Sequence, residues 1–357
     1  MPATRTRTGA PTSSPVIAPR RLPPRPSTAR SSISAPPDRS EVPMTSVPTE
    51  GDVLKMLDSL SNWGRWGADD QLGTVNFIAP AQRKRAAALV SEGVSVSCSR
   101  PISTDITADT TVQPMRFMVD SGEGRDTAPL ERNLQRRGAA EFIGMVFHGY
   151  TITHVDTPAH YFWNGRMYNG RSCNLITSRE GAQVEAVDLL RDGVVSRGVL
   201  LDVAAVKGRW LEAGEGVMPE DLEAAEKAQG VRVEPGDVLL VRTGYYARRR
   251  AEGPRSPLKD GSPAVHVASL PWIRERSVAM LGTDTHNDVS PLPYPRIGNA
   301  LHVVSLVAMG MWLIDNGNLE ELAQACARYR RWQFMLTVAP LVLERVTGSP
   351  VNPIAVF

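Results

Sequence analysis

The chain has 357 residues, 42% hydrophobic and 22% charged, a balance typical of a soluble globular protein with enough apolar side chains for a large core. Its 40 basic and 38 acidic residues give a net charge of +2, which excludes a strongly basic surface and therefore nucleic acid as the main partner. The three widely spaced cysteines argue against a disulfide framework and a cysteine zinc cluster, and they favour the cytoplasm.

Residues 1–48 are predicted to be a disordered extension. They are rich in Pro, Ser, Thr and Arg, and Asp38 is their first acidic residue. Such a segment buries too little apolar surface to offset the entropy lost on ordering. Two alternatives remain open: an organellar transit peptide, or a working start at Met44. The globular domain is expected to comprise residues 49–357.

Helical and strand-like patterns alternate through this domain. Residues 80–93 predict a helix that ends at Gly93, and residues 218–230 predict a second helix with Pro219 in its first turn and Gly230 as its stop. Short, nearly continuous apolar runs predict strands within residues 94–102, 111–120, 142–150, 198–206, 236–244, 277–284 and 333–340. This alternation favours a single α/β domain with a largely buried sheet.

The longest apolar run extends from Val303 to Ile314. It is much shorter than the roughly 20 residues that a membrane-spanning helix needs, so it predicts a buried helix and no membrane segment. Phosphate-binding Gly-rich loops, a dinucleotide fingerprint, a G-x-S-x-G elbow and a C-x-x-C pair are all missing from the sequence. Nucleotide-dependent and serine-hydrolase functions are therefore disfavoured.

The stretch HGYTITHVDTPAH contains three of the six histidines, His148, His154 and His160, together with Asp156. If residues 148–156 continue the preceding strand, the period of two places His148, His154 and Asp156 on one face. His154 and Asp156 would then lie about 7 Å apart, close enough to share a divalent cation. Imidazole and carboxylate ligands suit zinc or manganese.

His160 follows Pro158, which is expected to turn the chain and leave this histidine beside the metal, free for proton transfer. The competing interpretation is that these histidines are satisfied core residues. His302 and Asp315, on one straight helix, would be about 20 Å apart. They can act together only if the helix breaks near Gly310, and the residues by themselves favour a core role for both.

HVDTPAH resembles the core of the HxGTHxDxPxH signature of the cyclase family, which includes bacterial kynurenine formamidases and isatin hydrolase. Further stretches resemble the longer bacterial branch of that family and extend the resemblance over residues 55–357: NWGRWGADDQLGTVNFI, FWNGRMYNG, GDVLLVRTGYY, LGTDTHNDVSP, NLEELA and TGSPVNPIAVF.

The resemblance implies a swivelling β/β/α fold and a hydrolase that depends on one or two divalent metal ions, zinc or manganese. It implies a small-molecule substrate with an amide-type C–N bond: an aryl formamide such as N-formylkynurenine, from tryptophan catabolism, or a cyclic lactam such as isatin. An arylformamidase-like enzyme that forms a homo-oligomer, a dimer or larger, is therefore expected.

Roles carry over residue by residue. His154 and Asp156 match metal ligands of the motif, and Asp156 occupies the position that can bridge two ions. His160 matches the general acid/base. His302 matches a distal ligand, which reverses the core assignment made from the residues alone. Asp315 falls where the family has a glutamate ligand.

The sequence departs from the signature at three places. Tyr150 stands where the first ligand histidine is expected, Ile152-Thr153 replaces GT, and Asp315 is one methylene shorter than glutamate. His148, two residues before Tyr150, could enter the site through a bulge. These departures favour one metal held by His154, Asp156, His302 and His148 over two.

Three aromatic residues, Trp63, Trp66 and Tyr150, are candidates for substrate binding, the alternative for each being core packing. The altered ligand set also suggests a second function: a cyclase, dehydratase or lyase of secondary metabolism with altered or no metal. A non-catalytic small-molecule-binding protein is a third. The segment TDTHND, with Asp284, His286 and Asp288, is interpreted equally well as pocket lining or as a polar turn.

Overall fold

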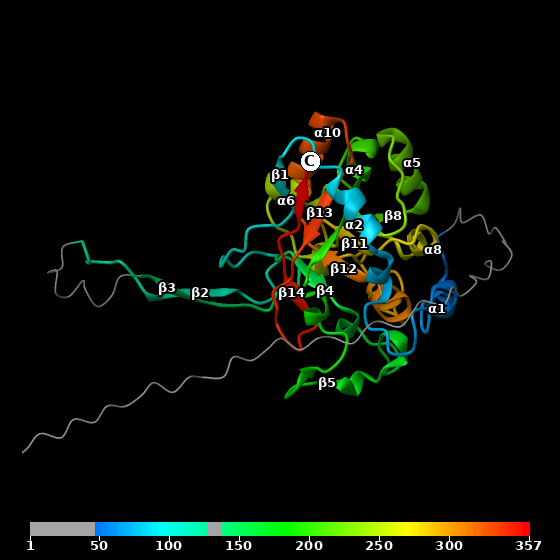
Figure 1. Cartoon of the computed structure of the whole chain (residues 1–357), viewed down its shortest axis with the longest axis horizontal. Helices are drawn as coiled ribbons and strands as arrows, with labels where there is room; N and C mark the ends of the chain where they lie inside the picture. Colours follow the sequence, from blue (N-terminus) through cyan, green and yellow to red (C-terminus); the bar gives the residue numbers. More distant parts are fainter. Residues whose placement is uncertain (1–46, 127–137) are drawn as a thin grey trace, which may run out of the picture. The chain divides into compact units, whose positions relative to one another are not determined.

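The computed structural model describes residues 47–126 and 138–357. The extension predicted for residues 1–48 therefore lies almost entirely outside the described part. The described chain is built around one nine-stranded sheet (Figure 1), whose strands lie in the following order: β1 (Ser95–Ser97), β15 (Ile354–Val356), β13 (Gln333–Val338), β7 (Val194–Asp202), β9 (Val238–Arg242), β11 (Met280–Thr283), β12 (Trp312–Asp315), β4 (His154–Asp156) and β14 (Gly348–Pro350).

The four central strands β7, β9, β11 and β12 are parallel, and all the flanking pairs are antiparallel. Alternate side chains of the central strands enter two separate apolar clusters; Leu239 and Leu281 belong to one cluster, and Leu240 and Met280 to the other. Both faces of the sheet are therefore covered, which is the reason that these strands read as unbroken apolar runs. The predicted α/β class is confirmed.

Helices and short sheets complete the domain (Figure 1). The helices are α1 (Glu50–Ser59), α2 (Pro80–Ala87), α4 (Val203–Lys207), α5 (Pro219–Gln229), α6 (Tyr245–Glu252), α7 (Pro257–Asp260), α8 (Leu270–Glu275), α9 (Ala300–His302), the π-helix η7 (Val303–Met309) and α10 (Glu320–Tyr329). The 3-10 turns are η1 (Gly73–Phe77), η2 (Pro158–His160), η3 (Tyr168–Gly170), η4 (Cys173–Leu175), η5 (Val187–Leu190) and η6 (Val267–Ser269). Two-stranded sheets pair β10 (Ala264–Val265) with β8 (Gly216–Val217), β2 (Met115–Asp120) with β3 (Ala140–Gly144), and β5 (Ile176–Thr177) with β6 (Gly181–Ala182).

Most expected elements form within a few residues of their predicted ends. The helix predicted for residues 218–230 is α5, which begins at Pro219 and is capped by Gly230 in the left-handed conformation. The helix predicted for residues 80–93 ends earlier, at Ala87. None of the helices in the described ranges is long and apolar enough to cross a membrane.

Two predictions of continuous structure were wrong. The strand expected through residues 142–156 is interrupted, because β3 ends at Gly144 and the chain bends until β4 begins at His154. The helix expected over residues 303–314 ends at Met309, and the rest of that run is strand β12. Gly310 causes this change, since its φ of +61° ends the helix and reverses the chain.

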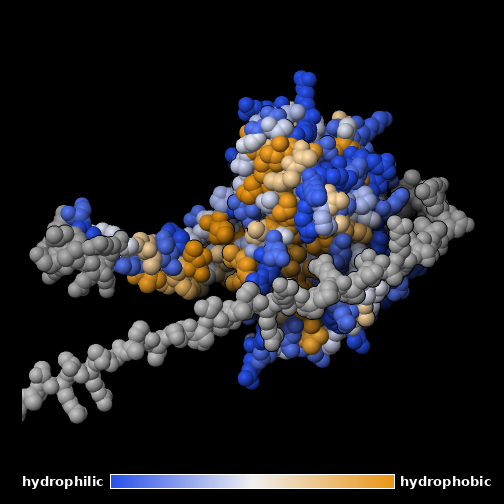
Figure 2. Space-filling model, viewed as in Figure 1, coloured by the Kyte–Doolittle hydropathy of each residue, from blue (hydrophilic) through white to orange (hydrophobic). Residues whose placement is uncertain are grey.

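The pair β2–β3 carries an apolar surface, visible as orange atoms in Figure 2. Phe117 of β2 pairs with Phe142 of β3, and their rings stack with centroids 4.9 Å apart, yet both remain largely exposed. Met115 and Val119 on β2 are exposed as well. No other described part of the chain buries this surface.

Gly310 offers a test of the chain reversal. A Cβ atom there would lie 2.5 Å from the ring of the fully buried Tyr168, whereas a Cβ at Gly208, also left-handed, would meet nothing within 4 Å. Gly208→Ala should therefore cost about 1–2 kcal/mol of unfolding free energy. Gly310→Ala should cost a further ~1–3 kcal/mol for overpacking. Equal losses in denaturant unfolding would contradict the packing argument.

Candidate metal centre

The pairing of β4 with β12 brings the first ligand candidates together. The two strands are antiparallel, with Asp315 directly opposite His154 and Leu313 opposite Asp156. Side chains two residues apart share a face, so His154, Asp156 and Asp315 all point to the same side of the sheet. Nε2 of His154 lies 3.4 Å from Oδ1 of Asp156 and 3.9 Å from Oδ2 of Asp315. Asp315 thus reaches the cluster despite its shorter side chain.

The helix α9 delivers His302 to this face. Nε2 of His302 lies 3.4 Å from Oδ2 of Asp156 and 3.6 Å from Oδ2 of Asp315. His302 and Asp315 can lie this close because Gly310 reverses the chain between the helix and β12. The sequence had indicated that the two residues could meet only if the helix broke near Gly310.

The segment between β3 and β4 brings in His148, although it is not part of a strand. Nδ1 of His148 lies 2.8 Å from Oδ1 of Asp156. Its ring stacks on that of His160, with centroids 3.7 Å apart and planes 7° from parallel. His160 comes from η2 after Pro158, and its Nε2 lies 3.9 Å from the same carboxylate oxygen. The structure therefore brings all five predicted metal ligands and the predicted acid/base into one cluster.

Three of these histidines have their outer ring nitrogen engaged by the protein. Nδ1 of His154 lies 2.8 Å from the carbonyl oxygen of Ile152, and Nε2 of His148 lies 3.1 Å from the hydroxyl of Thr347. Nδ1 of His302 lies 2.5 Å from Oδ2 of Asp288. In each case the other nitrogen faces Asp156, which is the arrangement that orients metal-binding histidines.

Asp156 lies at the middle of the cluster and is completely buried. Nδ1 of His148 approaches Oδ1 to 2.8 Å and Nε2 of His302 approaches Oδ2 to 3.4 Å, but neither contact within residues 47–126 and 138–357 has the geometry of a hydrogen bond. Burial by itself raises the pKa of this carboxyl group, but His160 and His154 beside it outweigh that effect and hold the pKa well below its usual range. A buried, ionised carboxylate requires a compensating charge, which protonated neighbouring histidines or a bound cation can supply.

Two overlapping groups of potential ligands share Asp156. His148 and His160 complete one group, and His154 and Asp315 complete the other; within each group the ligand atoms lie within 4.8 Å of one another. The carboxylate oxygens and the inward ring nitrogens fit a divalent cation. His148, His154 and His160 all face Oδ1 of Asp156, and His302 faces Oδ2, so these side chains and Asp315 would hold the cation.

The cluster lines a cavity of about 320 Å³. Tyr161 is mostly buried within it, which raises the pKa of its hydroxyl to about 12. Burial lowers the pKa of both His160 and His286 to about 4. The cavity is lined by Thr111, Val112, His148, Gly149, Tyr150, His154, Asp156, His160, Tyr161, His286, Asn299, His302 and Asp315.

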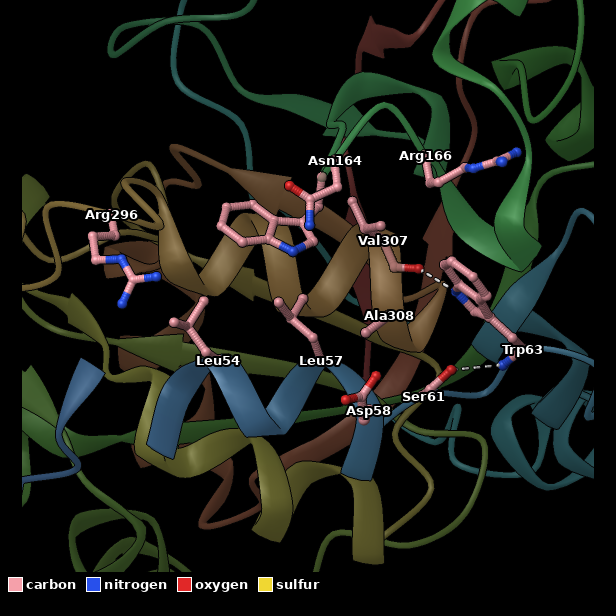
Figure 3. Close-up of a pocket in the computed structure, with 11 residues that line it drawn as sticks. Leu54, Leu57, Asp58, Ser61, Trp63, Asn164, Arg166, Arg296, Val307 and Ala308 are labelled. Carbon is pink, nitrogen blue, oxygen red and sulfur yellow. Dashed lines mark hydrogen bonds between the residues drawn. The ribbon is translucent and has the colours of Figure 1, made fainter. Parts of the chain in front are cut away.

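The two tryptophans named as substrate-binding candidates lie elsewhere. Trp63 lines a separate cavity of about 490 Å³ between α1 and η7, where its indole nitrogen donates to the carbonyl of Val307 at 2.7 Å (Figure 3). Trp66 packs edge-on against Phe77, with ring centroids 5.1 Å apart. Of the three aromatic candidates, only Tyr150 lines the cavity of the metal cluster.

Sequence reasoning left out three residues of the site. His286 lines the cavity, Asp288 orients His302, and the side-chain nitrogen of Asn287 donates to Oδ1 of Asp315 at 2.5 Å. All three belong to the polar segment after strand β11. Its composition fits a simple turn equally well, so only the pairing of β11 beside β12 reveals their role.

The fold and this cluster define an α/β protein with a histidine–carboxylate cluster that could hold a metal ion, and comparison identifies the family. Residues 87–287, more than half of the chain, match the family model described as "Putative cyclase". This chain belongs to the cyclase family. A solved structure described as a novel cyclase is 30% identical and has a TM-score of 0.73; the match covers 84% of this chain and 100% of that chain.

Two further solved structures share the fold. Isatin hydrolase A from Labrenzia aggregata, bound to benzyl benzoate, is 19% identical with a TM-score of 0.52. An isatin hydrolase bound to the product analogue thioisatinate is 15% identical with a TM-score of 0.51. Each match covers 76% of this chain and 94% of the other. None of the curated proteins matches the chain.

Asp288 is expected to act on the metal through His302. Its two oxygens accept from Nδ1 of His302 and from the backbone amide of Leu301. Asp288→Asn should weaken metal binding about 10–100-fold, as loss of such a partner does elsewhere. Titration against a metal-chelating dye measures this loss.

A double variant distinguishes a loss of His302 orientation from a general disruption of the site. In a protein that already carries His302→Ala, the substitution Asp288→Asn should weaken metal binding hardly any further, because the ring that Asp288 orients is missing. If the losses of metal-binding free energy in the two single variants add in the double variant, Asp288 does not act by orienting His302.

Proposed function

We propose that this protein is a metal-dependent hydrolase of an amide-type C–N bond, with an aryl formamide or a cyclic lactam as substrate. The observation that carries the proposal is the buried carboxylate of Asp156, whose two oxygens are faced by the inward nitrogens of His148, His154 and His302. Family membership and the hydrolases that share the fold support the same reaction class.

A divalent cation held by His154, Asp156, His302, Asp315 and His148 would make a bound water molecule more acidic and would polarise the substrate carbonyl. The protein's own task is to orient the reactants and to move protons. In hydrolysis the water oxygen bonds to the carbonyl carbon, the C–N bond breaks, and the leaving nitrogen receives a proton. One side chain near the cluster must carry that proton.

His160 is the best candidate for this proton transfer. No described residue engages its second ring nitrogen, unlike those of His148, His154 and His302. Its side chain is 23% exposed, as is that of His148, compared with 2% for His154 and 5% for His302, so exposure and the unengaged ring nitrogen together distinguish His160. A histidine that is near the cluster, open to the cavity and less firmly held suits an acid/base role.

A second function, a dehydratase, lyase or cyclase with altered or no metal, is favoured by one observation. Tyr150 stands where the family signature has a ligand histidine, and its ring turns to His286 instead, with centroids 4.8 Å apart. Acid/base chemistry by the histidine cluster alone would then suffice. Turnover that survives exhaustive chelation, with no gain when metal is added back, would select this function.

The hydrolase proposal predicts distinct effects for two histidines. His160→Ala should keep the metal but lower kcat on N-formylkynurenine or isatin by about 10²–10⁴-fold, the usual contribution of a general acid/base. His154→Ala should lose the metal. Elemental analysis of protein purified without added chelator, together with steady-state kinetics, measures both effects.

His266→Ala serves as the control, since His266 is buried outside this cavity and bonds to Tyr294. The folded fraction of this variant should have the metal content and the kcat of the wild type. Loss of metal in His160→Ala would make His160 a ligand, and full turnover by that variant would remove it from the mechanism.

A further inference from the structure

The cavity that contains Trp63 is separate from the metal cavity, and the two share no lining residue. It lies between α1, η7 and the turn that joins η2 to η3 (Figure 3). Its volume of about 490 Å³ is within the range of small-molecule sites. Its size and its separation from the metal cluster indicate a ligand site of its own, here called the Trp63 cavity.

The long walls of the Trp63 cavity are apolar. Leu54 and Leu57 of α1 line it on one side, and Val307 and Ala308 of η7 line it on the other (Figure 3). The indole ring of Trp63 lies at one end. A flat apolar ring placed between the two helices would lose its contact with water and pack against these side chains, which favours binding of an aromatic molecule.

Hydrogen bonds hold the Trp63 end of this cavity in place. The indole nitrogen of Trp63 donates to the carbonyl of Val307 at 2.7 Å (Figure 3). Beside it, Asn62 donates from its backbone amide to the carbonyl of Ala308 and from its side chain to the carbonyl of Met309, both at 2.9 Å. Because these bonds are already formed, a ligand would meet a preformed site and lose little free energy in ordering it.

A cationic side chain, that of Arg296, lies at the opposite end of the cavity (Figure 3). Oε1 of Glu50 accepts a hydrogen bond from the backbone amide of Arg296 at 2.6 Å and so fixes this residue beside α1. The guanidinium itself makes neither a hydrogen bond nor an ion pair with any residue of the described ranges. It can therefore bind a carboxylate through two parallel hydrogen bonds.

The remaining charged residues of the lining restrict the ligand to one acidic group. Asp58 lies near Ser61, away from Arg296 (Figure 3). Its carboxylate has no hydrogen bond or ion pair within the part of the chain that the structure describes, so a second acidic group at this end would meet a like charge. Arg166 points away from the cavity and donates to the carbonyl of Gly170 at 3.1 Å.

We propose that the Trp63 cavity is a second ligand site, which binds a small aromatic acid with one carboxylate. The ring lies between α1 and η7, the carboxylate binds to Arg296, and Asp58 disfavours a second carboxylate at the other end. The site does not depend on the hydrolase proposal, because none of the side chains of the metal cluster lines it.

Three probes that share a naphthalene ring test this site by calorimetric titration of the purified protein: 2-naphthoate, its neutral counterpart 2-naphthamide, and 2,6-naphthalenedicarboxylate. The protein should bind 2-naphthoate about tenfold more tightly than 2-naphthamide, because a hydrogen bond to a charged group contributes about that factor. The dicarboxylate should also bind more weakly than 2-naphthoate, because its second carboxylate would lie near Asp58.

Substitutions assign each contribution to a residue. Arg296→Gln should lower the affinity for 2-naphthoate to that for 2-naphthamide. Arg191→Gln is the matched control, since Arg191 is also exposed but does not line the cavity, and it should change neither affinity. Asp58→Asn should raise the affinity for the dicarboxylate several-fold and leave that for 2-naphthoate unchanged. Leu57→Ala should weaken the binding of 2-naphthoate and 2-naphthamide by the same factor.

Binding at the metal cluster is measured separately, because a carboxylate can also coordinate a cation. The variant His154→Ala, which lacks one ligand of the cluster, should still bind one 2-naphthoate per chain, and adding Arg296→Gln should weaken that binding about tenfold. Equal affinities for 2-naphthoate and 2-naphthamide, or wild-type affinity in Arg296→Gln, would overturn the inference. Complete loss of binding in His154→Ala would assign the probe to the metal cavity and overturn it as well.

Discussion

The carboxylate of Asp156 is the constraint on which the site depends. It is fully buried, and its oxygens have no hydrogen-bond partner among the described residues, yet four histidines and a second aspartate surround it. An isolated charge in such a place would be costly. A divalent cation would compensate it, which explains why ligand-type atoms gather there from the bend before β4, from β4 itself, and from η2, α9 and β12.

Backbone geometry makes that convergence possible. The antiparallel register of β4 and β12 sets His154 opposite Asp315, and the reversal at Gly310 returns the chain from His302 to β12. The reversal in turn depends on close packing around Gly310. Its carbonyl accepts from the amide of Thr74 at 3.0 Å, and Tyr168 lies against its Cα. The site is therefore assembled from segments that are distant in the sequence, and none of them contains all of its residues.

The residues that face Asp156 are themselves oriented by hydrogen bonds to neighbouring residues. Asp288, Thr347 and the carbonyl of Ile152 each engage the outer nitrogen of one histidine, and Asn287 holds the outer oxygen of Asp315. His160 has no such support from the described residues. This contrast divides the cluster into three oriented histidines and one less restrained imidazole, which is the arrangement that the proposed metal-assisted hydrolysis requires.

The sequence by itself determined the α/β class, most strands and the ends of α5. These features depend on local signals, namely the periodicity of apolar residues and the Pro and Gly residues at the ends of elements. It also indicated His154, Asp156 and His160 through their spacing, and the family resemblance added His302 and Asp315. The tertiary structure decided that His148 rather than Tyr150 faces Asp156, since the expected strand bends there. It likewise placed His286 and Asp288 at the site and Trp63 in another cavity. These outcomes depend on which strands pair and where the chain reverses, and such non-local contacts leave no periodic trace along the sequence.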